Sequence, residues 1–127
     1  MKSKGQLLVA TAIVSCSVPG LLSAHHGAAA YDRERTISLD ATVTAFEWEN
    51  PHALIRLATA DDEGLAQEWI AETAGLVILV RAGWNSATLK PGDSCTVIGH
   101  PAKNDSHTMI LQRVILADGR ELGNYIP

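Results

Sequence analysis

Five short β-forming segments, with turn motifs between several of them, constrain the fold of this chain more than any other feature. The clearest is 36–49, in which every second residue from 37 to 45 is apolar. A period of two places those residues on one face of a β-strand. Further strands are expected at 52–59, 66–72, 94–99 and 108–116. The sequence therefore predicts a mainly β protein.

The first strand changes face part-way along its length. Phe46 and Trp48 fall on the opposite parity from the apolar residues before them, which predicts a bulge or a strong bend. Asn50-Pro51 ends the strand, because proline cannot continue a hydrogen-bonded ladder. The other breaks are turn motifs, namely Asp61-Asp62-Glu63-Gly64, Lys90-Pro91-Gly92-Asp93, and Asp118-Gly119 before a short tail.

The segment 76–81 is nearly all apolar, so periodicity alone does not separate a buried strand from a short helix. Thr73 can act as an N-cap, and Gly83 stands where a left-handed residue commonly follows a helix. These two signals favour a short helix.

The resulting order is three strands, one helix and two strands. This is the order of the OB-fold, a five-stranded Greek-key barrel with a helix between its third and fourth strands. Closure would remove the exposed edges that an open sheet must protect. An open α+β sheet is the competing interpretation.

Residues 1–24 have the pattern of a secretory signal peptide. Lys2 and Lys4 precede an uncharged stretch at 7–22, which is shorter than the roughly 20 residues of a spanning helix. Leu22-Ser23-Ala24 ends it with a small residue. We expect a periplasmic or secreted protein, with one domain at 25–127 that begins with an arm at 25–35.

A lipoprotein signal is the rival interpretation of the same stretch. Cys16 would then become the lipidated first residue of the mature protein. The apolar run continues past Cys16, whereas a lipoprotein usually turns polar there, so cleavage after Ala24 is preferred.

Cleavage after Ala24 also changes the charge. It removes two lysines and leaves 8 bases against 14 acids, a net charge of −6. An acidic surplus argues against nucleic acid as a partner and suits the binding of a cation. Cys95 would be the one cysteine left, so no disulfide framework is expected. We expect its thiol, in mid-strand, to be buried and inert.

Several motifs resemble those of a family of small exported bacterial proteins that carries only a domain-of-unknown-function label. They are His25-His26-Gly27, Phe46-Glu47-Trp48-Glu49-Asn50-Pro51-His52, Gly83-Trp84, Leu89-Lys90-Pro91-Gly92-Asp93 and Asp118-Gly119-Arg120. The resemblance spans essentially all of the mature chain and implies an exported single domain without an established activity. This chain has Cys95 where the resemblance leads us to expect valine, which suggests a core position.

The five histidines are the main pointer to chemistry. Imidazole is the commonest metal ligand in proteins and suits copper, zinc and nickel. Cleavage after Ala24 would make His25 the first residue, so that its amine and Nδ1 could chelate one metal, as in copper-binding histidine braces. His26 adds a second imidazole beside it.

The predicted fold brings further histidines towards the same place. In OB-folds the loops between strands 1–2 and 4–5 flank the ligand face. His52 follows the first loop, His107 ends the second, and the arm is long enough to reach that side. We therefore predict a copper site formed by His25, His26, His52 and His107, to which Met109 could add a soft ligand for Cu(I).

Each of these residues also has a structural interpretation. His25 and His26 could belong to a flexible terminus, His52 could bond a turn carbonyl, and His107 could be a solvated loop residue. His100, between Gly99 and Pro101, is expected to be structural. Trp69 is expected in the core. Trp48 and Trp84 could close the barrel or stack on a sugar. The acidic set of Glu47, Glu49, Glu68 and Glu72 is expected to form a solvated outer face.

No catalytic motif is present, because the chain has no Gly-x-Ser-x-Gly elbow, glycine-rich phosphate loop or Cys-x-x-Cys-His. We expect an exported, non-enzymatic binding protein that holds copper. A peptide- or glycan-binding OB module without metal is the alternative. A small histidine-brace copper oxidase is a third interpretation, although the mature chain leaves little room for a substrate platform.

Overall fold

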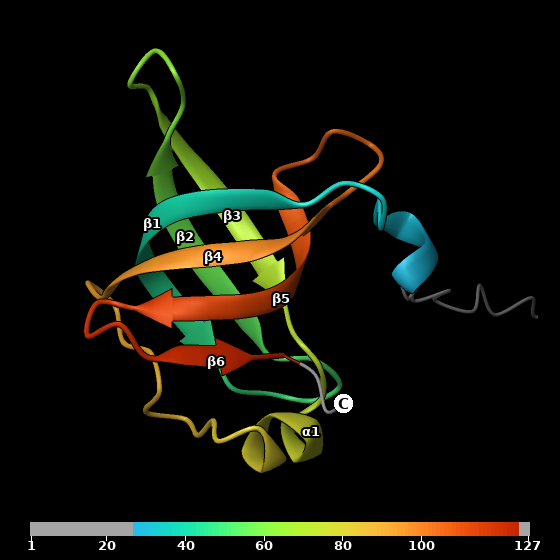
Figure 1. The fold of residues 1–127 in the computed structure, drawn as a ribbon, viewed down its shortest axis with the longest axis vertical. Coiled ribbons are helices and arrows are strands. Elements are labelled where there is room, and N and C mark those ends of the chain that lie inside the picture. Colours follow the sequence, from blue (N-terminus) through green and yellow to red (C-terminus); the bar gives the residue numbers. More distant parts are fainter. Residues whose placement is uncertain (1–26, 125–127) are drawn as a thin grey trace, which may run out of the picture.

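In the computed structural model, which describes residues 27–124, five strands close into a barrel (Figure 1). The strands are β1 (Ile37–Glu47), β2 (Leu54–Ala60), β3 (Ala66–Glu72), β4 (Ser94–Pro101) and β5 (Thr108–Leu116). Their order is β3-β2-β1-β4-β5, and a parallel pairing of β3 with β5 completes the ring. The predicted OB-like Greek-key barrel is therefore confirmed, and the open sheet is excluded.

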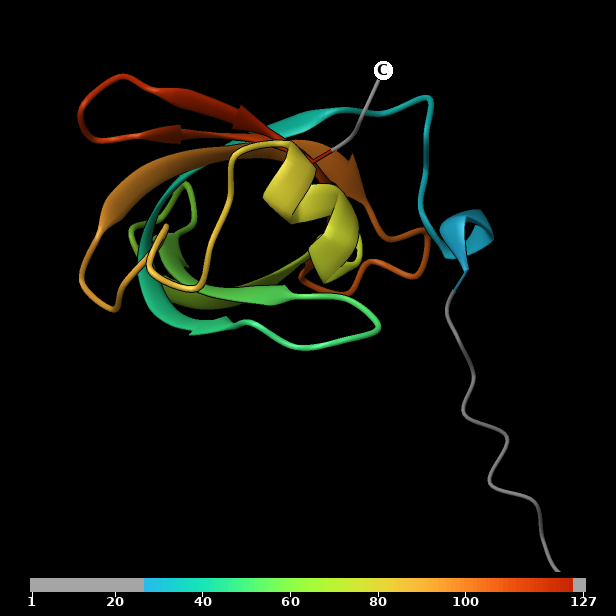
Figure 2. The ribbon, with the colours of Figure 1, turned by 90° about the horizontal axis from the view of Figure 1, so that it is seen from below.

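Three elements lie outside the barrel strands. The 3-10 helix η1 (Ala28–Ala30) begins the described chain, and α1 (Leu76–Arg81) joins β3 to β4, as predicted. Figure 2 shows α1 across one open end of the barrel. Among residues 27–124, no helix is long and apolar enough to cross a membrane.

The third element, β6 (Glu121–Gly123), was not predicted. Only a turn and a short tail were expected after Asp118, but β6 forms a hairpin with β5 and pairs with Arg113–Ile115. Three residues are too few to show an alternating pattern, which is why the sequence did not reveal this strand.

The predicted bulge in β1 is present. Val43 pairs with Leu57 and Phe46 pairs with Ile55, so the register shifts by one residue between Val43 and Ala45. Phe46 thereby packs against the same core as Val43, although the two have opposite parity. The expected strand was slightly too long, because Trp48 and Glu49 lie beyond the end of β1.

The start of α1 differs from the prediction. Its N-cap is Gly75, without a side-chain cap, and Thr73 is buried two residues earlier. The Thr73 hydroxyl donates to the Ala53 carbonyl at 2.8 Å, so it joins the ends of β2 and β3 instead of capping the helix. Gly83 follows the helix with φ +92°, as expected.

The core fills the barrel from all sides and continues under α1. Trp84 is 2 % exposed, and its indole N–H donates to the Gly123 carbonyl at 2.8 Å. Trp48 meets Phe46 edge-on, with ring centroids 5.5 Å apart. Met109, suggested as a soft metal ligand, has no exposed surface because its parity on β5 turns it inwards.

Candidate functional site

The arm that precedes β1 lies against the β4–β5 loop (Figure 1). Tyr31 forms an isolated antiparallel bridge with Ala102, and the Asp32 amide donates to the Pro101 carbonyl at 2.8 Å. Tyr31 is only 6 % exposed, and its hydroxyl donates to Oε2 of Glu72 at 2.7 Å. The arm is thus anchored to β3 across the barrel closure.

Glu72 has a second neighbour on its other side. Its Oε1 lies 3.7 Å from Nε2 of His52. Nδ1 of His52 lies 3.0 Å from the Thr73 carbonyl oxygen, which can only accept, so Nδ1 carries the hydrogen. The lone pair of the neutral ring is then on Nε2, which faces the carboxylate. We call this arrangement the Tyr31–Glu72–His52 row.

The loop that carries His52 is held by backbone contacts at the end of β3. The Thr73 amide donates to the Ala53 carbonyl at 3.0 Å, which extends the β2–β3 pairing past Glu72. At Gly75, an added Cβ would lie 3.1 Å from the Pro51 carbonyl oxygen, so glycine permits this close approach. The loop therefore fixes the direction in which His52 points.

The environment of Tyr31 keeps its phenol protonated. Burial raises the pKa of Tyr31, and its hydrogen bond to Glu72 and the charge of that carboxylate raise the pKa further. The phenol is therefore a permanent donor to Glu72 at neutral pH.

His107 lies in different surroundings. Its ring stacks on Trp69, with centroids 5.1 Å apart and planes 14° from parallel. The parallel register pairs Thr108 with Ile70, so His107 is level with Trp69, whereas His52 is level with Thr73. Four residues of β3 correspond to about 13 Å. The structure therefore does not bring His52 and His107 together.

Of the remaining histidines, the structure describes His100 but not His25 and His26. His100 is structural, as predicted, because Nδ1 bonds the Arg35 carbonyl at 2.8 Å and Nε2 bonds the Gln112 amide at 2.8 Å. His25 and His26 lie outside the described residues. Within residues 27–124, no group of three or more His, Cys, Asp and Glu side chains is arranged to hold a metal ion.

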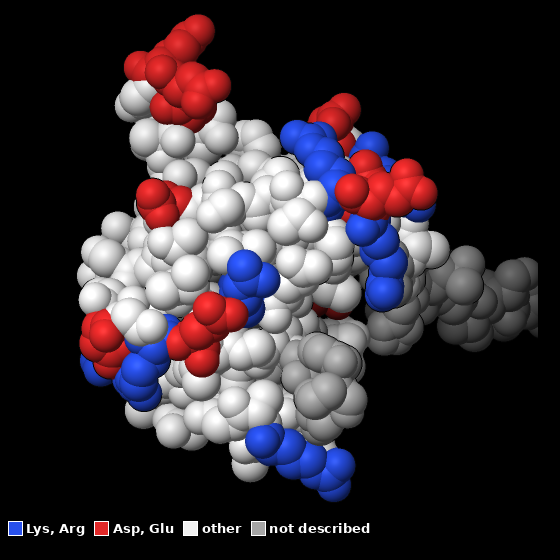
Figure 3. Space-filling view, viewed as in Figure 1, with Lys and Arg blue, Asp and Glu red and all other residues white. Residues whose placement is uncertain are grey.

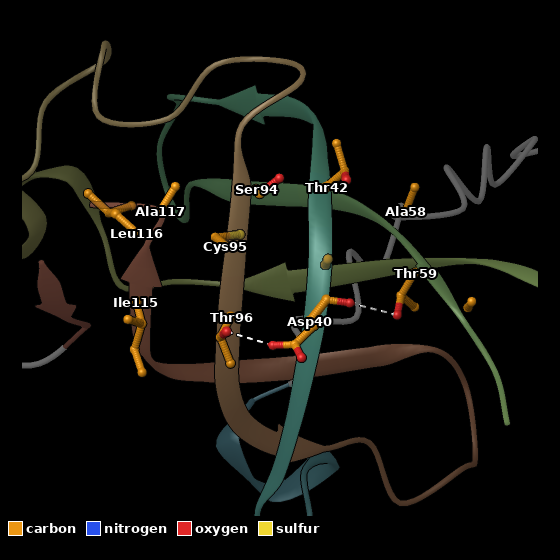
Figure 4. Close-up of a pocket in the computed structure, with 12 residues that line it drawn as sticks. Asp40, Thr42, Ala58, Thr59, Ser94, Cys95, Thr96, Ile115, Leu116 and Ala117 are labelled. Carbon is orange, nitrogen blue, oxygen red and sulfur yellow. Dashed lines mark hydrogen bonds between the residues drawn. The ribbon is translucent and has the colours of Figure 1, made fainter. Parts of the chain in front are cut away.

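A shallow hollow over β1, β4 and the ends of β2 and β5 has a different character (Figure 4). Its polar groups bond each other, since Thr96 donates to Oδ1 of Asp40 at 2.6 Å and Thr59 donates to the Asp40 carbonyl at 3.0 Å. Burial, together with the charges of Asp93 and Asp40, raises the pKa of the Cys95 thiol to about 11. The Cys95 thiol is thus protonated at neutral pH and does not act as a nucleophile there.

Two groups of charged side chains lie at the top of the face in Figure 3. One is the acidic β2–β3 turn, which contains Asp61, Asp62 and Glu63. The other is the arm with the β4–β5 loop, where both signs are mixed. The Arg113–Glu121 ion pair, with a separation of 3.0 Å, joins β5 to β6.

Tyr31 and the role of Glu72 were not predicted from the sequence. Glu72 was grouped with a solvated acidic face, but it is half-buried between Tyr31 and His52. Glu72 directly follows Ala71, which is buried, at the end of β3. That position was only a weak indication that Glu72 would be partly buried. Its partner Tyr31 lies 41 positions earlier in the sequence, and the periodicity of a single strand does not predict contacts over such a separation.

Comparison with known proteins bears on the family alone. The model of DUF6152, a family of unknown function, matches residues 12–111, which include the whole Tyr31–Glu72–His52 row. No curated protein and no solved structure matches the chain. Because the match spans most of the sequence, the chain belongs to DUF6152, a family of unknown function.

Proposed function

We propose that this chain is an exported, non-enzymatic protein that binds copper where its amino-terminal arm meets the end of β3. One observation carries the proposal: the Tyr31–Glu72–His52 row puts an imidazole, a carboxylate and the anchor of the arm in one place. Cleavage after Ala24 would add the amine and imidazole of His25.

His52 has the orientation of a metal ligand. Ligating histidines usually donate their second ring N–H to a carbonyl or carboxylate, which fixes the ring and the tautomer. Here the Thr73 carbonyl takes that hydrogen, and Nε2 is directed to Glu72 at the surface, with the His52 side chain 45 % exposed. An ion between Nε2 and the carboxylate would need little rearrangement of the ring.

The anchor at Tyr31 limits how far the arm histidines can be from this place. His25 lies six positions before Tyr31. A fully extended chain of that length spans at most about 20 Å. Two imidazoles and a free amine make a nitrogen-rich set, which suits Cu(II). Glu72 would complete the set as an oxygen ligand.

The test uses protein whose mass confirms a start at His25. Cu(II) is titrated into the wild type, His52→Ala, Glu72→Gln and a form with one extra residue before His25. We expect each change to weaken Cu(II) binding about tenfold or more, because each removes a ligand. His107→Ala is the matched control and should bind as the wild type does, since His107 is held against Trp69.

Two outcomes would contradict the proposal. Equal affinity with and without the extra residue would exclude the amine as a ligand. If neither His52→Ala nor Glu72→Gln changed the affinity for Cu(II), the end of β3 would be excluded as the copper site. Thermal unfolding of each apoprotein checks that the variants fold.

A further inference from the structure

Two neighbouring hollows lie along β3, with volumes of about 460 and 190 Å³, and Ile70 lines both. We refer to the two hollows together as the groove. Tyr31 and Glu72 stand at one end, and Glu68 and His107 at the other. Glu68 and Glu72 are four residues apart on one strand, which corresponds to about 13 Å. That length suits a short oligomer better than a single small molecule.

The groove lies on the side of the barrel that OB-folds use for ligands. In that fold, the face of the second and third strands, between the 1–2 and 4–5 loops, binds oligonucleotides or oligosaccharides. Here Leu54 comes from β2, Ile70 and Glu72 from β3, and the wall from the β4–β5 loop. The position of the groove is therefore consistent with either an oligonucleotide or an oligosaccharide as ligand.

The charge of the lining decides between them. Glu68 and Glu72 bring two carboxylates into the groove, while Arg56 is already paired with Glu47. Lys103 is the other cation among the lining residues. A phosphate backbone gains its affinity from Lys and Arg contacts and is repelled by carboxylates. The lining therefore disfavours an oligonucleotide and is compatible with an uncharged ligand.

The end at His107 supplies a flat surface. The exposed His107 ring is backed by Trp69, which packs against the core, so the ring is held in a fixed plane. A flat ring with an apolar face can cover the apolar face of a sugar. The Glu68 carboxylate beside it can accept hydrogen bonds from sugar hydroxyls.

We propose that this groove binds a neutral oligosaccharide, with His107 as the stacking platform and Glu68 as a hydroxyl acceptor. The site needs no metal, and it uses a different histidine from the copper site. The two proposals can therefore fail separately.

The test is carried out in EDTA, on protein that starts at His25. Cellotetraose, chitotetraose and maltotetraose are each titrated into isotope-labelled protein, and the amide signals are followed by NMR. We expect at least one sugar to shift the signals of Ile70 and His107 in a saturable way. His107→Ala should raise its Kd about tenfold, by loss of the stacked ring.

Two further variants make the test specific. His107→Phe keeps a flat ring and should retain most of the affinity. His52→Ala, which alters the copper site, should leave the sugar Kd unchanged. The absence of saturable shifts with all three sugars would overturn the proposal, as would a Kd unaffected by His107→Ala. Binding of a thymidine oligonucleotide or of an arginine-rich peptide in place of the sugars would also overturn it.

Discussion

At the scale of the residue, position within the fold sets the chemistry of a side chain more than its type does. Glu68 and Glu72 lie on the same strand, yet Glu68 is exposed whereas Glu72 lies between Tyr31 and His52. Cys95 is similar, because burial inside β4, together with the charges of Asp93 and Asp40, raises the pKa of its thiol.

The raised pKa of Cys95 predicts a stability that depends on pH. The thiol loses its proton near 9.0 when exposed but near 11 when folded. The protonated form is thus favoured by folding, so this contribution is complete below pH 9 and is lost as the pH rises towards 11. At pH 10.5 we expect the free energy of unfolding to have fallen by about 2 kcal/mol from this residue.

Cys95→Val is the matched control for that measurement, because valine fills a similar volume without a titrating group. Denaturant unfolding at pH 8 and at pH 10.5 gives the fall for each protein. The wild type should lose more stability than the variant. Tyr31, whose pKa is raised too, titrates in both proteins and cancels in the comparison. Equal losses would show that Cys95 does not titrate differently on folding.

At the scale of the element, two irregularities shape the barrel. One is the bulge in β1, which lets a single strand pair with β4 along its first half and with β2 along its second. The other lies between β4 and β5, where the register shifts at Ile98 and Gly99. Bulges increase local twist and bend a strand, which a small closed barrel requires.

Gly99 at the second irregularity should not tolerate a side chain. A Cβ there would overlap the Ile110 carbonyl oxygen and lie 3.0 Å from Sδ of Met109. Since the first obstacle is backbone, relief requires the two strands to separate. We expect Gly99→Ala to cost about 3 kcal/mol or more, measured by denaturant unfolding.

Gly27→Ala is the control for Gly99→Ala, because nothing lies within 4 Å of the Cβ it would add. That variant should unfold like the wild type. A similarly small change for Gly99→Ala would mean that β4 and β5 are less closely packed than the structure has them.

At the scale of the whole molecule, Asn124, the last described residue, joins the start of α1 to the barrel. Oδ1 of Asn124 accepts from the Ala74 amide at 2.6 Å, just before α1. Its Nδ2 donates to the Leu111 carbonyl of β5 at 2.6 Å. Together with the bond from Trp84 to Gly123, these contacts hold α1 over the open end of the barrel.

Asn124→Ala should therefore destabilise the entire fold. It removes a hydrogen-bond partner from the Ala74 amide and from the Leu111 carbonyl near the core, and Asn124 itself is 7 % exposed. We expect a loss of about 3 kcal/mol in the free energy of unfolding. Asn104→Ala is the control, since the Asn104 side chain bonds Ser106 within an exposed loop, and it should cost less than about 1 kcal/mol. Equal losses for the two variants would contradict this role.

The sequence by itself determined the elements of the barrel. The five barrel strands, the short helix and the bulge in β1 follow from local patterns, because side-chain alternation, proline and turn residues act within a few positions. Closure of the barrel was decided by the parallel pairing of β3 with β5, which no local pattern specifies. The structural role of His100 was predicted from its position between Gly99 and Pro101, and the burial of Cys95 from its place in a strand.

Only the tertiary structure decided which side chains meet. Tyr31 and Glu72 are joined across 41 positions, and Asn124 and Ala74 across 50. His52 and His107, which the topology was expected to bring together, are separated because the register of β3 with β5 sets them at different levels. Local patterns specify which face of a strand a residue occupies, whereas the register between strands distant in sequence specifies its neighbours.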